Sequence, residues 1–218
     1  MERCRAIVFD LDGTLVDSYG PITASLNAAR ATRGLPPVSE DQVRLEVGHG
    51  LESLVERHLG REHVERGVQA FRDAYARLYA AGTRPLPGVP EIPRRLHARG
   101  LRLAVASNKL AKFGRPIVAQ VGLADVIPVV LGPDCGVPTK PSPEMLELAL
   151  RELGVAPAEA LYVGDMPLDV ESARRAGLRH FVIPTGSADR ATLLATPGAC
   201  VLDDLAAVEA QIESVAGA

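Results

Sequence analysis

The sequence predicts an α/β fold, in which a Rossmann-like parallel sheet carries a helical cap inserted after its first strand. Outside residues 18–84, short apolar runs alternate with amphipathic stretches, and this order is typical of a parallel sheet covered on both faces. Residues 18–84 show helical periodicity without a clear strand. The length of 218 residues, 47% of them hydrophobic, accommodates a core and an insertion.

The sheet core is expected to begin with a strand at 6–9, followed after the insertion by a helix near 89–99 and a strand at 101–106. The later expected strands are 126–131, 160–163, 179–183 and 199–202, with helices near 110–121, 143–153 and 168–176 and at the C-terminus. Glycines that suit left-handed helix ends follow four of the helices: Gly100, Gly122, Gly154 and Gly177. Ser142-Pro143 suits an N-cap followed by a first-turn proline.

Within the insertion, Ser39 and Gln42 have the spacing of a capping box at a helix start. Apolar residues three or four apart predict a further helix with a buried stripe: Val64, Val68, Phe71, Tyr75, Leu78 and Tyr79. The insertion begins at Asp17-Ser18 and ends in the proline- and glycine-rich segment 83–88, which predicts a flexible linker. We therefore expect a sheet core of residues 1–17 and 85–218 and a helical cap of residues 18–84.

The composition limits the possible partners. A net charge of −3 argues against nucleic acid or an anionic membrane surface, and no apolar run approaches the ~20 residues of a membrane span. The N-terminus shows no export signal, and three scattered cysteines suit reduced thiols. We expect a cytoplasmic protein without nucleic-acid or membrane partners, either a monomer or a homodimer.

Two carboxylates follow the first predicted strand. Asp10 and Asp12 stand one residue apart where the strand 6–9 ends, so both can face one crevice at the carboxyl edge of the sheet. Close carboxylates repel each other unless a cation or a shared proton relieves them. The arrangement suits a divalent metal, with one carboxylate free to act as a nucleophile.

The segment 7–18 resembles the first motif of the haloacid dehalogenase-like (HAD) phosphohydrolases, and three later segments match that family in order. They are Leu103–Lys109, the sequence Lys140-Pro141-Ser142-Pro143, and Leu161–Asp169. Only three of the 24 basic residues are lysines, and Lys140 suits a point charge beside phosphate. We expect Lys109 and Lys112 at a helix start on the rim of the site.

The resemblance implies a set of roles for the motif residues. Asp10 matches the nucleophile that forms an aspartyl-phosphate, and Asp12 matches the general acid that protonates the leaving alcohol. Mg²⁺ is expected to bind the Asp10 side chain, the Asp12 backbone carbonyl and Asp165. The transferring phosphoryl group is expected to hydrogen-bond to the Ser107 hydroxyl and the Asn108 backbone amide and to pair with Lys140.

Two further assignments are less direct. Gly13 and Thr14 follow the strand in a turn, whose amides are expected to bind phosphate oxygens. Asp169 lies four residues after Asp165, and three readings stay open for it: the metal site through a bound water, a partner for Lys140, or an exposed aspartate at a helix start.

The presence of Asp12 favours a phosphate ester, because an alcohol leaving group needs a proton and a halide does not. The stretch 47–57 resembles the corresponding part of phosphoglycolate phosphatases, and His49 or Arg57 is expected to meet a substrate carboxylate. The predicted function is therefore that of an Mg²⁺-dependent phosphomonoester hydrolase for a small molecule, with 2-phosphoglycolate as the first candidate substrate. The alternatives are another small phosphate (sugar phosphate, nucleotide or pyrophosphate), a 2-haloacid dehalogenase and a non-catalytic phosphate-binding module.

Overall fold

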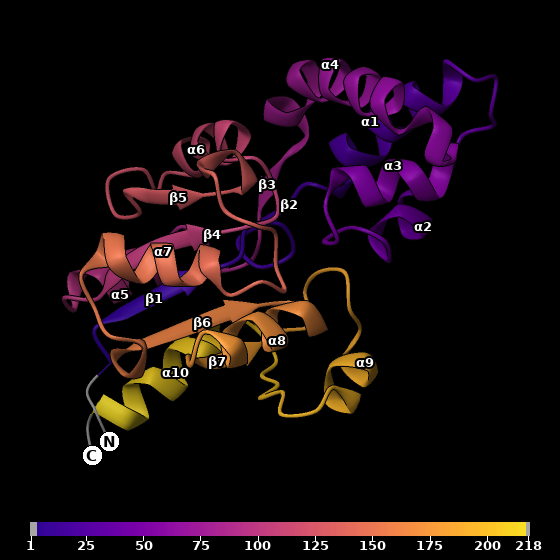
Figure 1. Cartoon of the computed structure of the whole chain (residues 1–218). Coiled ribbons are helices and arrows are strands. Elements are labelled where there is room, and N and C mark those ends of the chain that lie inside the picture. Colours follow the sequence, from indigo (N-terminus) through magenta and orange to yellow (C-terminus); the bar gives the residue numbers. More distant parts are fainter. Residues whose placement is uncertain (1–3, 217–218) are drawn as a thin grey trace.

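The computed structural model describes residues 4–216 as a sheet core with a helical body at one end (Figure 1). Its five-stranded sheet is parallel and has the order β5-β4-β1-β6-β7. The strands are β1 (Ala6–Phe9), β4 (Arg102–Ala106), β5 (Val129–Leu131), β6 (Ala160–Gly164) and β7 (Arg179–Val182). The predicted α/β fold is confirmed.

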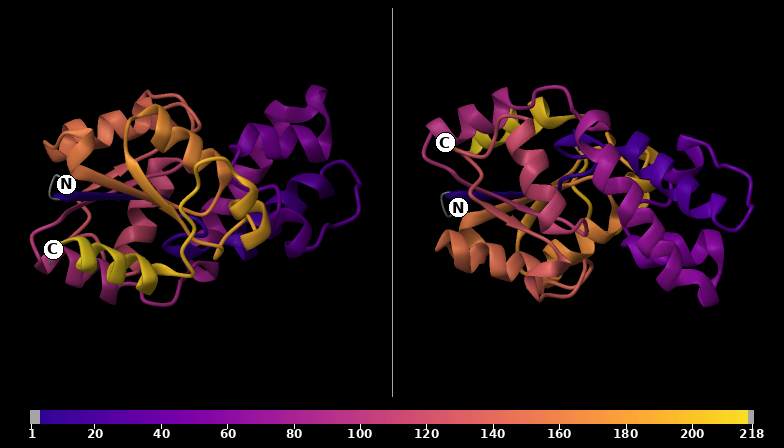
Figure 2. Two further views of the ribbon diagram at one scale, coloured as in Figure 1. Left: turned by 90° about the horizontal axis from the view of Figure 1, so that it is seen from below. Right: turned by 90° about the horizontal axis from the view of Figure 1, so that it is seen from above.

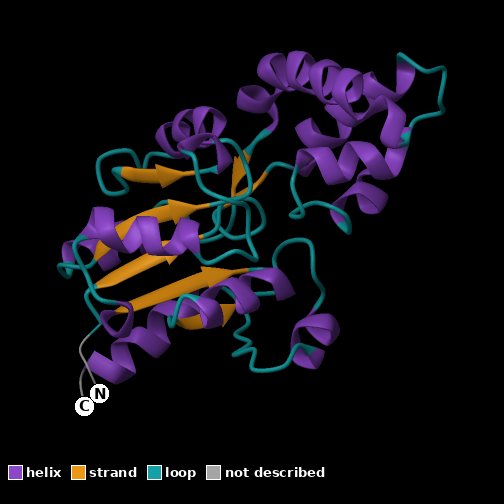
Figure 3. Ribbon diagram, viewed as in Figure 1, coloured by secondary structure: helices purple, strands orange, loops and turns teal. Residues whose placement is uncertain are grey.

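Helices cover both faces of this sheet, as Figure 3 shows. Alternate residues of β1 point to opposite faces, so Ile7 and Phe9 join one hydrophobic cluster while Ala6 and Val8 join the other. The first cluster includes residues of α5 (Glu91–Ala98), α6 (Ala111–Gln120) and α10 (Leu205–Ala216). The second includes residues of α7 (Glu144–Leu153) and α8 (Pro167–Arg175). All four β1 residues are buried, which explains their uninterrupted apolar run.

The chain order of the strands creates a crevice beside β1. From β1 the sheet continues to β4 and β5 on one side, and only then to β6 and β7 on the other. Ligands of open α/β sheets bind at such a reversal, beyond the carboxyl ends of the strands. The helical body lies at this same end of the sheet in all the ribbon views (Figures 1 and 2).

The helical body consists of α1 (Tyr19–Ala31), α2 (Glu40–Arg44), α3 (Leu51–Leu59), a 3₁₀ turn at Arg61–His63, and α4 (Val64–Gly82). It has a hydrophobic cluster of its own, to which Val68, Phe71 and Tyr75 contribute. The capping box predicted for Ser39 and Gln42 is present. Leu78 departs from the predicted stripe, because it is 39% exposed.

The two crossings between the sheet core and the helical body are paired. β2 (Val16–Asp17) runs antiparallel to β3 (Arg84–Pro85), and the Leu86 amide donates to the Leu15 carbonyl at 3.0 Å. The segment 83–88, predicted as a linker, thus contains a short strand. A strand of two residues is too short to show an alternating pattern in a sequence. Proline also argues against a strand, although it is tolerated at an edge position.

Other differences are local. The predicted strand 199–202 is a single bridge between Val201 and Val182, and the short helix α9 (Arg190–Ala195) was not predicted. Ser142 hydrogen-bonds the Glu144 carboxylate and caps no backbone amide. The four glycines predicted at helix ends all have positive φ. All three cysteines are free. Among residues 4–216, no helix has both the length and the apolar character of a membrane span.

Candidate active site

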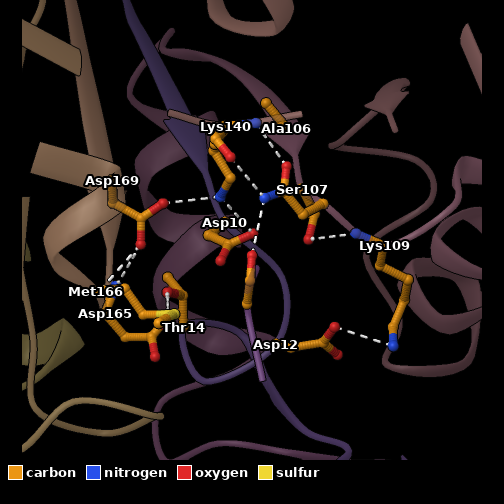
Figure 4. Close-up of polar contacts among 12 residues, drawn as sticks. Asp10, Asp12, Thr14, Ala106, Ser107, Lys109, Lys140, Asp165, Met166 and Asp169 are labelled. Carbon is orange, nitrogen blue, oxygen red and sulfur yellow. Dashed lines mark hydrogen bonds and ion pairs between the residues drawn. The ribbon is translucent and has the colours of Figure 1, made fainter. Parts of the chain in front are cut away.

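The four motifs meet at the carboxyl edge of the sheet (Figure 4). Asp10 follows β1, Ser107 follows β4 and Asp165 follows β6, while Lys140 comes from the loop before α7. Asp10 and Ser107 line a cavity of about 320 Å³ between the sheet core and the helical body. From the core it is lined by Asp10, Asp12, Ser107, Asn108 and Lys109, and from the helical body by Leu51, Leu54, Phe71, Arg72 and Tyr75.

Lys140 is a buried cation held between two carboxylates. Its Nζ lies 3.0 Å from Asp10 Oδ1 and 2.8 Å from Asp169 Oδ1, and it donates to the Tyr162 hydroxyl at 2.7 Å. Burial alone would lower the pKa of Lys140, but the charges of Asp10 and Asp169 outweigh it and raise the pKa. Lys140 therefore stays an ammonium, fixed beside the predicted nucleophile.

Asp169 is the partner that orients Lys140. Besides the lysine, its Oδ1 accepts from the Tyr162 hydroxyl at 2.9 Å, and its Oδ2 accepts from the amides of Asp165 and Met166 at 3.1 and 3.0 Å. It is completely buried, so the reading of an exposed helix-start aspartate is wrong, and the reading of a lysine partner is confirmed. With both oxygens occupied, Asp169 fits a supporting position beside a metal better than a ligand position.

Negative charge is concentrated between Asp10 and Asp165. Single oxygens of Asp10, Asp165 and Asp169 all lie within 4.8 Å of one another. Burial raises the pKa of Asp10 to about 6, against the opposing charge of Lys140, and burial with the charge of Asp169 raises the pKa of Asp165. Asp10 Oδ1 is buried, and the Lys140 ammonium at 3.0 Å is its charged neighbour. The three carboxylates carry more negative charge than the Lys140 ammonium balances. Such a group of hard oxygen donors suits a small divalent cation.

The position of Asp165 depends on two glycines. Its Oδ2 accepts from the Ser187 amide at 2.7 Å, and its Oδ1 lies 3.5 Å from the Thr14 hydroxyl. A Cβ on Gly186 would lie 1.9 Å from Asp165 Oδ2 and 2.7 Å from the Gly13 Cα, and Gly13 itself has a φ of +82°. This close approach leaves room for glycine alone.

We expect Gly186→Ala to displace Asp165 and to lower kcat/KM for the predicted phosphomonoester hydrolysis by roughly 10- to 100-fold. This is the typical effect of removing a group that supports a metal ligand. The measurement is kcat/KM as a function of Mg²⁺, with the expected loss partly recovered at high Mg²⁺. Gly20→Ala in α1 is the matched control, because its new Cβ would come no closer than 3.5 Å to another atom. Unchanged kinetics in Gly186→Ala would show that Asp165 tolerates displacement.

The amides predicted to bind phosphate are engaged inside their own turn. The Gly13 amide donates to the Val16 carbonyl at 2.8 Å, and the Thr14 amide donates weakly to the Leu11 carbonyl at 3.4 Å. In this arrangement the Gly13 amide has no free hydrogen for a phosphate oxygen. The turn instead shapes the pocket of Asp165.

Asp12 belongs to a separate cluster. Its Oδ1 accepts from the Ser18 hydroxyl at 2.5 Å, and its Oδ2 lies 2.9 Å from the ammonium of Lys109. The prediction that Lys109 stands on the rim is wrong: its side chain is 8% exposed and it donates to the Tyr75 hydroxyl of α4 at 2.8 Å. Lys112 is exposed, as predicted. Figure 4 shows Lys109 and Lys140 on different sides of Asp10.

Ser107 and Asn108 fill adjacent positions after β4. Ser107 is buried, and its hydroxyl hydrogen-bonds Asp10 in a way that lowers the pKa of that carboxyl. The Asn108 side chain donates to the carbonyls of Gly48 and Lys140 at 2.8 and 3.0 Å, and accepts from the Lys140 amide at 2.7 Å. Asn108 therefore ties the loop of Lys140 to the helical body, a side-chain role that the motif did not reveal.

Neither His49 nor Arg57 is among the residues that line the cavity, although Gly48 and Gly50 beside His49 are. His49 is exposed, and Arg57 is 53% exposed with its Nε 3.7 Å from Glu46 Oε2. The cationic side chains that line the cavity are instead Arg72, paired with Glu52 at 3.1 Å, and Lys109. One signal in the sequence could have identified Lys109, which is the rarity of lysine in this chain.

Known proteins match both the sequence and the fold. A model of the haloacid dehalogenase-like hydrolase family matches residues 7–183. The chain is 37% identical to an N-acetylmuramic acid 6-phosphate phosphatase of Pseudomonas aeruginosa, covering 84% of this chain and 83% of that one. It is 36% identical to a phosphoglycolate phosphatase of Chromobacterium violaceum, covering 88% and 90% of the two chains.

Solved structures agree with these relatives. The crystal structure of a predicted phosphoglycolate phosphatase from Haemophilus somnus superimposes with a TM-score of 0.84 at 28% identity, covering 95% of this chain and 97% of that one. A predicted phosphatase from Clostridium acetobutylicum has the same fold, with a TM-score of 0.89 at 20% identity, covering 98% and 100%. The predictions of the family and of a phosphatase are confirmed: the chain belongs to the haloacid dehalogenase-like hydrolases.

Proposed function

We propose that the protein is an Mg²⁺-dependent phosphomonoester hydrolase for a small carboxylated phosphate, with 2-phosphoglycolate as the first candidate. The observation that carries this proposal is the division of the site into two charged clusters around one cavity. Asp10 with Lys140 and Asp165 suits the phosphoryl group, whereas Asp12 with Ser18 and Lys109 suits the leaving oxygen. The helical body, as a cap, would close the cavity.

Asp10 would attack phosphorus in line, forming a bond from its carboxylate oxygen to phosphorus while the bond to the ester oxygen breaks. Asp12 would give its proton to that ester oxygen, so the alcohol leaves neutral. The ionised Asp12, which lies 2.9 Å from the Lys109 ammonium, would then take a proton from water attacking the aspartyl-phosphate. This step releases inorganic phosphate and restores both aspartates.

Lys140 and Ser107 would keep the phosphoryl group and Asp10 in place. The ammonium of Lys140 lies 3.0 Å from Asp10 and is itself fixed by Asp169 and Tyr162, so it offers a preorganised positive charge. Mg²⁺, bound by the Asp10 side chain, the Asp12 carbonyl and Asp165, would neutralise charge on the phosphoryl oxygens. Asp169 would support this site through Lys140.

Removal of Mg²⁺ is expected to abolish turnover and to destabilise the protein. A ligand that binds only the folded state adds about 2.7 kcal/mol at a hundredfold excess over its Kd, which corresponds to roughly 5–10 °C in Tm for a chain of this size. Thermal denaturation and phosphate release with EDTA and with added Mg²⁺ measure both effects. Ca²⁺ should restore Tm but little turnover, because its coordination is looser. If the Tm changes with neither Mg²⁺ nor Ca²⁺, the result would contradict the metal site.

The substrate proposal draws on two relatives. One is named a phosphoglycolate phosphatase and the other an N-acetylmuramic acid 6-phosphate phosphatase, and both named compounds combine a phosphate monoester with a carboxylate. The test is phosphate release from a panel of esters: 2-phosphoglycolate, N-acetylmuramic acid 6-phosphate, sugar phosphates, nucleotides, pyrophosphate and ethyl phosphate. A kcat/KM for ethyl phosphate equal to that for both carboxylated esters would reject a carboxylated substrate.

A further inference from the structure

Lys109 is a buried lysine to which the motifs assign no task. Its ammonium contacts the Asp12 carboxylate at 2.9 Å and donates to the Tyr75 hydroxyl at 2.8 Å. A lysine side chain that pairs with a carboxylate carries its proton as an ammonium. An ammonium has three donors, and these two contacts leave the third for another acceptor.

The contact with Asp12 places the Lys109 ammonium near the leaving group of a substrate. A general acid must come within hydrogen-bond distance of the ester oxygen that it protonates. In 2-phosphoglycolate, only one methylene separates that ester oxygen from the carboxylate carbon. A cation that touches the acid is therefore close to the ester oxygen and within reach of a carboxylate on the adjacent carbon. Lys109 also lines the cavity.

We infer that Lys109 is a specificity-determining residue that binds the carboxylate of phosphate esters of α-hydroxy acids. This inference rests on the proposed phosphatase function and narrows its substrate class. A 6-phosphorylated sugar acid carries its carboxylate many bonds from the ester oxygen, so Lys109 would favour 2-phosphoglycolate over such a compound. Charge-assisted hydrogen bonds between an ammonium and a carboxylate are the strong ones in proteins.

The other cations near the cavity are less suited to this task. Lys140 is saturated by Asp10, Asp169 and Tyr162 on the phosphoryl side. Arg72 is paired with Glu52, whose negative charge opposes a second carboxylate. Among the described residues that line the cavity, Lys109 is thus the cation placed beside the leaving group.

Tyr75 makes the position of Lys109 depend on the helical body. Its ring packs edge-on against Phe113 of α6, with the ring centroids 5.1 Å apart, and stacks on Phe71 of α4 at 5.6 Å. Lys109 Nζ also lies 4.7 Å from the centroid of the Tyr75 ring. Tyr75 is therefore a positioning residue, since it holds Lys109 only while α4 is seated on the sheet core.

The test compares 2-phosphoglycolate with ethyl phosphate, which replaces the carboxylate with a methyl group. In the wild type we expect a higher kcat/KM for 2-phosphoglycolate. Lys109→Met should reduce the ratio of the two kcat/KM values by about 10- to 100-fold, the range expected for a hydrogen bond to a charged group. The loss should lie mainly in KM for 2-phosphoglycolate. Lys109→Arg should recover part of the ratio, and Tyr75→Phe should lower it by a smaller factor.

Lys112→Met is the matched control, because this exposed lysine lies three residues further along the chain and is not among the residues that line the cavity. The ratio for this variant should equal that of the wild type. If Lys109→Met lowers kcat/KM equally for both substrates, the inference is overturned, because Lys109 would then act only through Asp12. If that variant does not fold, Lys109→Arg and Tyr75→Phe decide by the same ratio. A wild type without preference for 2-phosphoglycolate would reject the proposed substrate, and the inference with it, before any variant is compared.

Discussion

Asp10→Asn is expected to abolish turnover, with a loss on the order of 10⁴-fold or more in kcat for every phosphate ester. The amide that replaces the carboxylate is a poor nucleophile, so no aspartyl-phosphate forms, and removing one member of a cooperating catalytic group costs nearly as much as removing all of it. The measurement is phosphate release under saturating Mg²⁺, together with mass spectrometry of acid-quenched enzyme. The wild type should show a phosphorylated peptide containing residue 10, and the variant should not.

The fold should survive this change. Lys140 retains Asp169 at 2.8 Å and the Tyr162 hydroxyl at 2.7 Å, so the buried ammonium is not left without a partner. An uncharged side chain also lessens the repulsion that raises the pKa of Asp165. The Tm of the metal-free variant should therefore equal or exceed that of the metal-free wild type. Near-normal kcat in a folded Asp10→Asn variant would show that the nucleophile lies elsewhere.

The parts of the site that could be predicted from the sequence are those fixed by strand ends. Asp10, Ser107 and Asp165 each follow an apolar run, and the carboxyl ends of adjacent parallel strands must meet. Asp169 is close enough to Asp165 in sequence for a shared turn to be expected. A contact between Asp169 and Lys140 could also be predicted, because both residues belong to motifs of one site.

The parts that could not be predicted depend on how α4 sits against the core. Lys109 looks like a rim residue in sequence, and only the approach of Tyr75 and the turn of Asp12 bury it. His49 lies in a glycine-flanked loop, which predicts contact with substrate, but its side chain is exposed and does not line the cavity. Amphipathic periodicity predicts which side of α4 is apolar, but it contains no information on which core residue that side meets.

Asp12→Asn is expected to reduce activity according to the leaving group. General acid catalysis contributes roughly 10²–10⁴-fold, so hydrolysis of 2-phosphoglycolate or ethyl phosphate should fall by about that factor. The p-nitrophenolate ion leaves without a proton, so the first step on p-nitrophenyl phosphate should fall much less. Some loss should remain in steady state, because ionised Asp12 also helps water to attack the aspartyl-phosphate. A rapid-quench measurement of the phosphoenzyme burst separates the two steps.

Ser18→Ala is the graded control for that variant. It removes the 2.5 Å hydrogen bond to Asp12 Oδ1 but keeps the carboxylate and its contact with Lys109, so we expect a loss with the same dependence on leaving group and a smaller size. Ser18 is the N-cap residue of α1, and Lys109 contacts Tyr75 of α4, so each oxygen of the acid is linked to the helical body. An Asp12→Asn variant that slows phosphoenzyme formation equally from ethyl and p-nitrophenyl phosphate would remove the acid role from Asp12. It would leave this carboxylate with a part in orienting water or the metal.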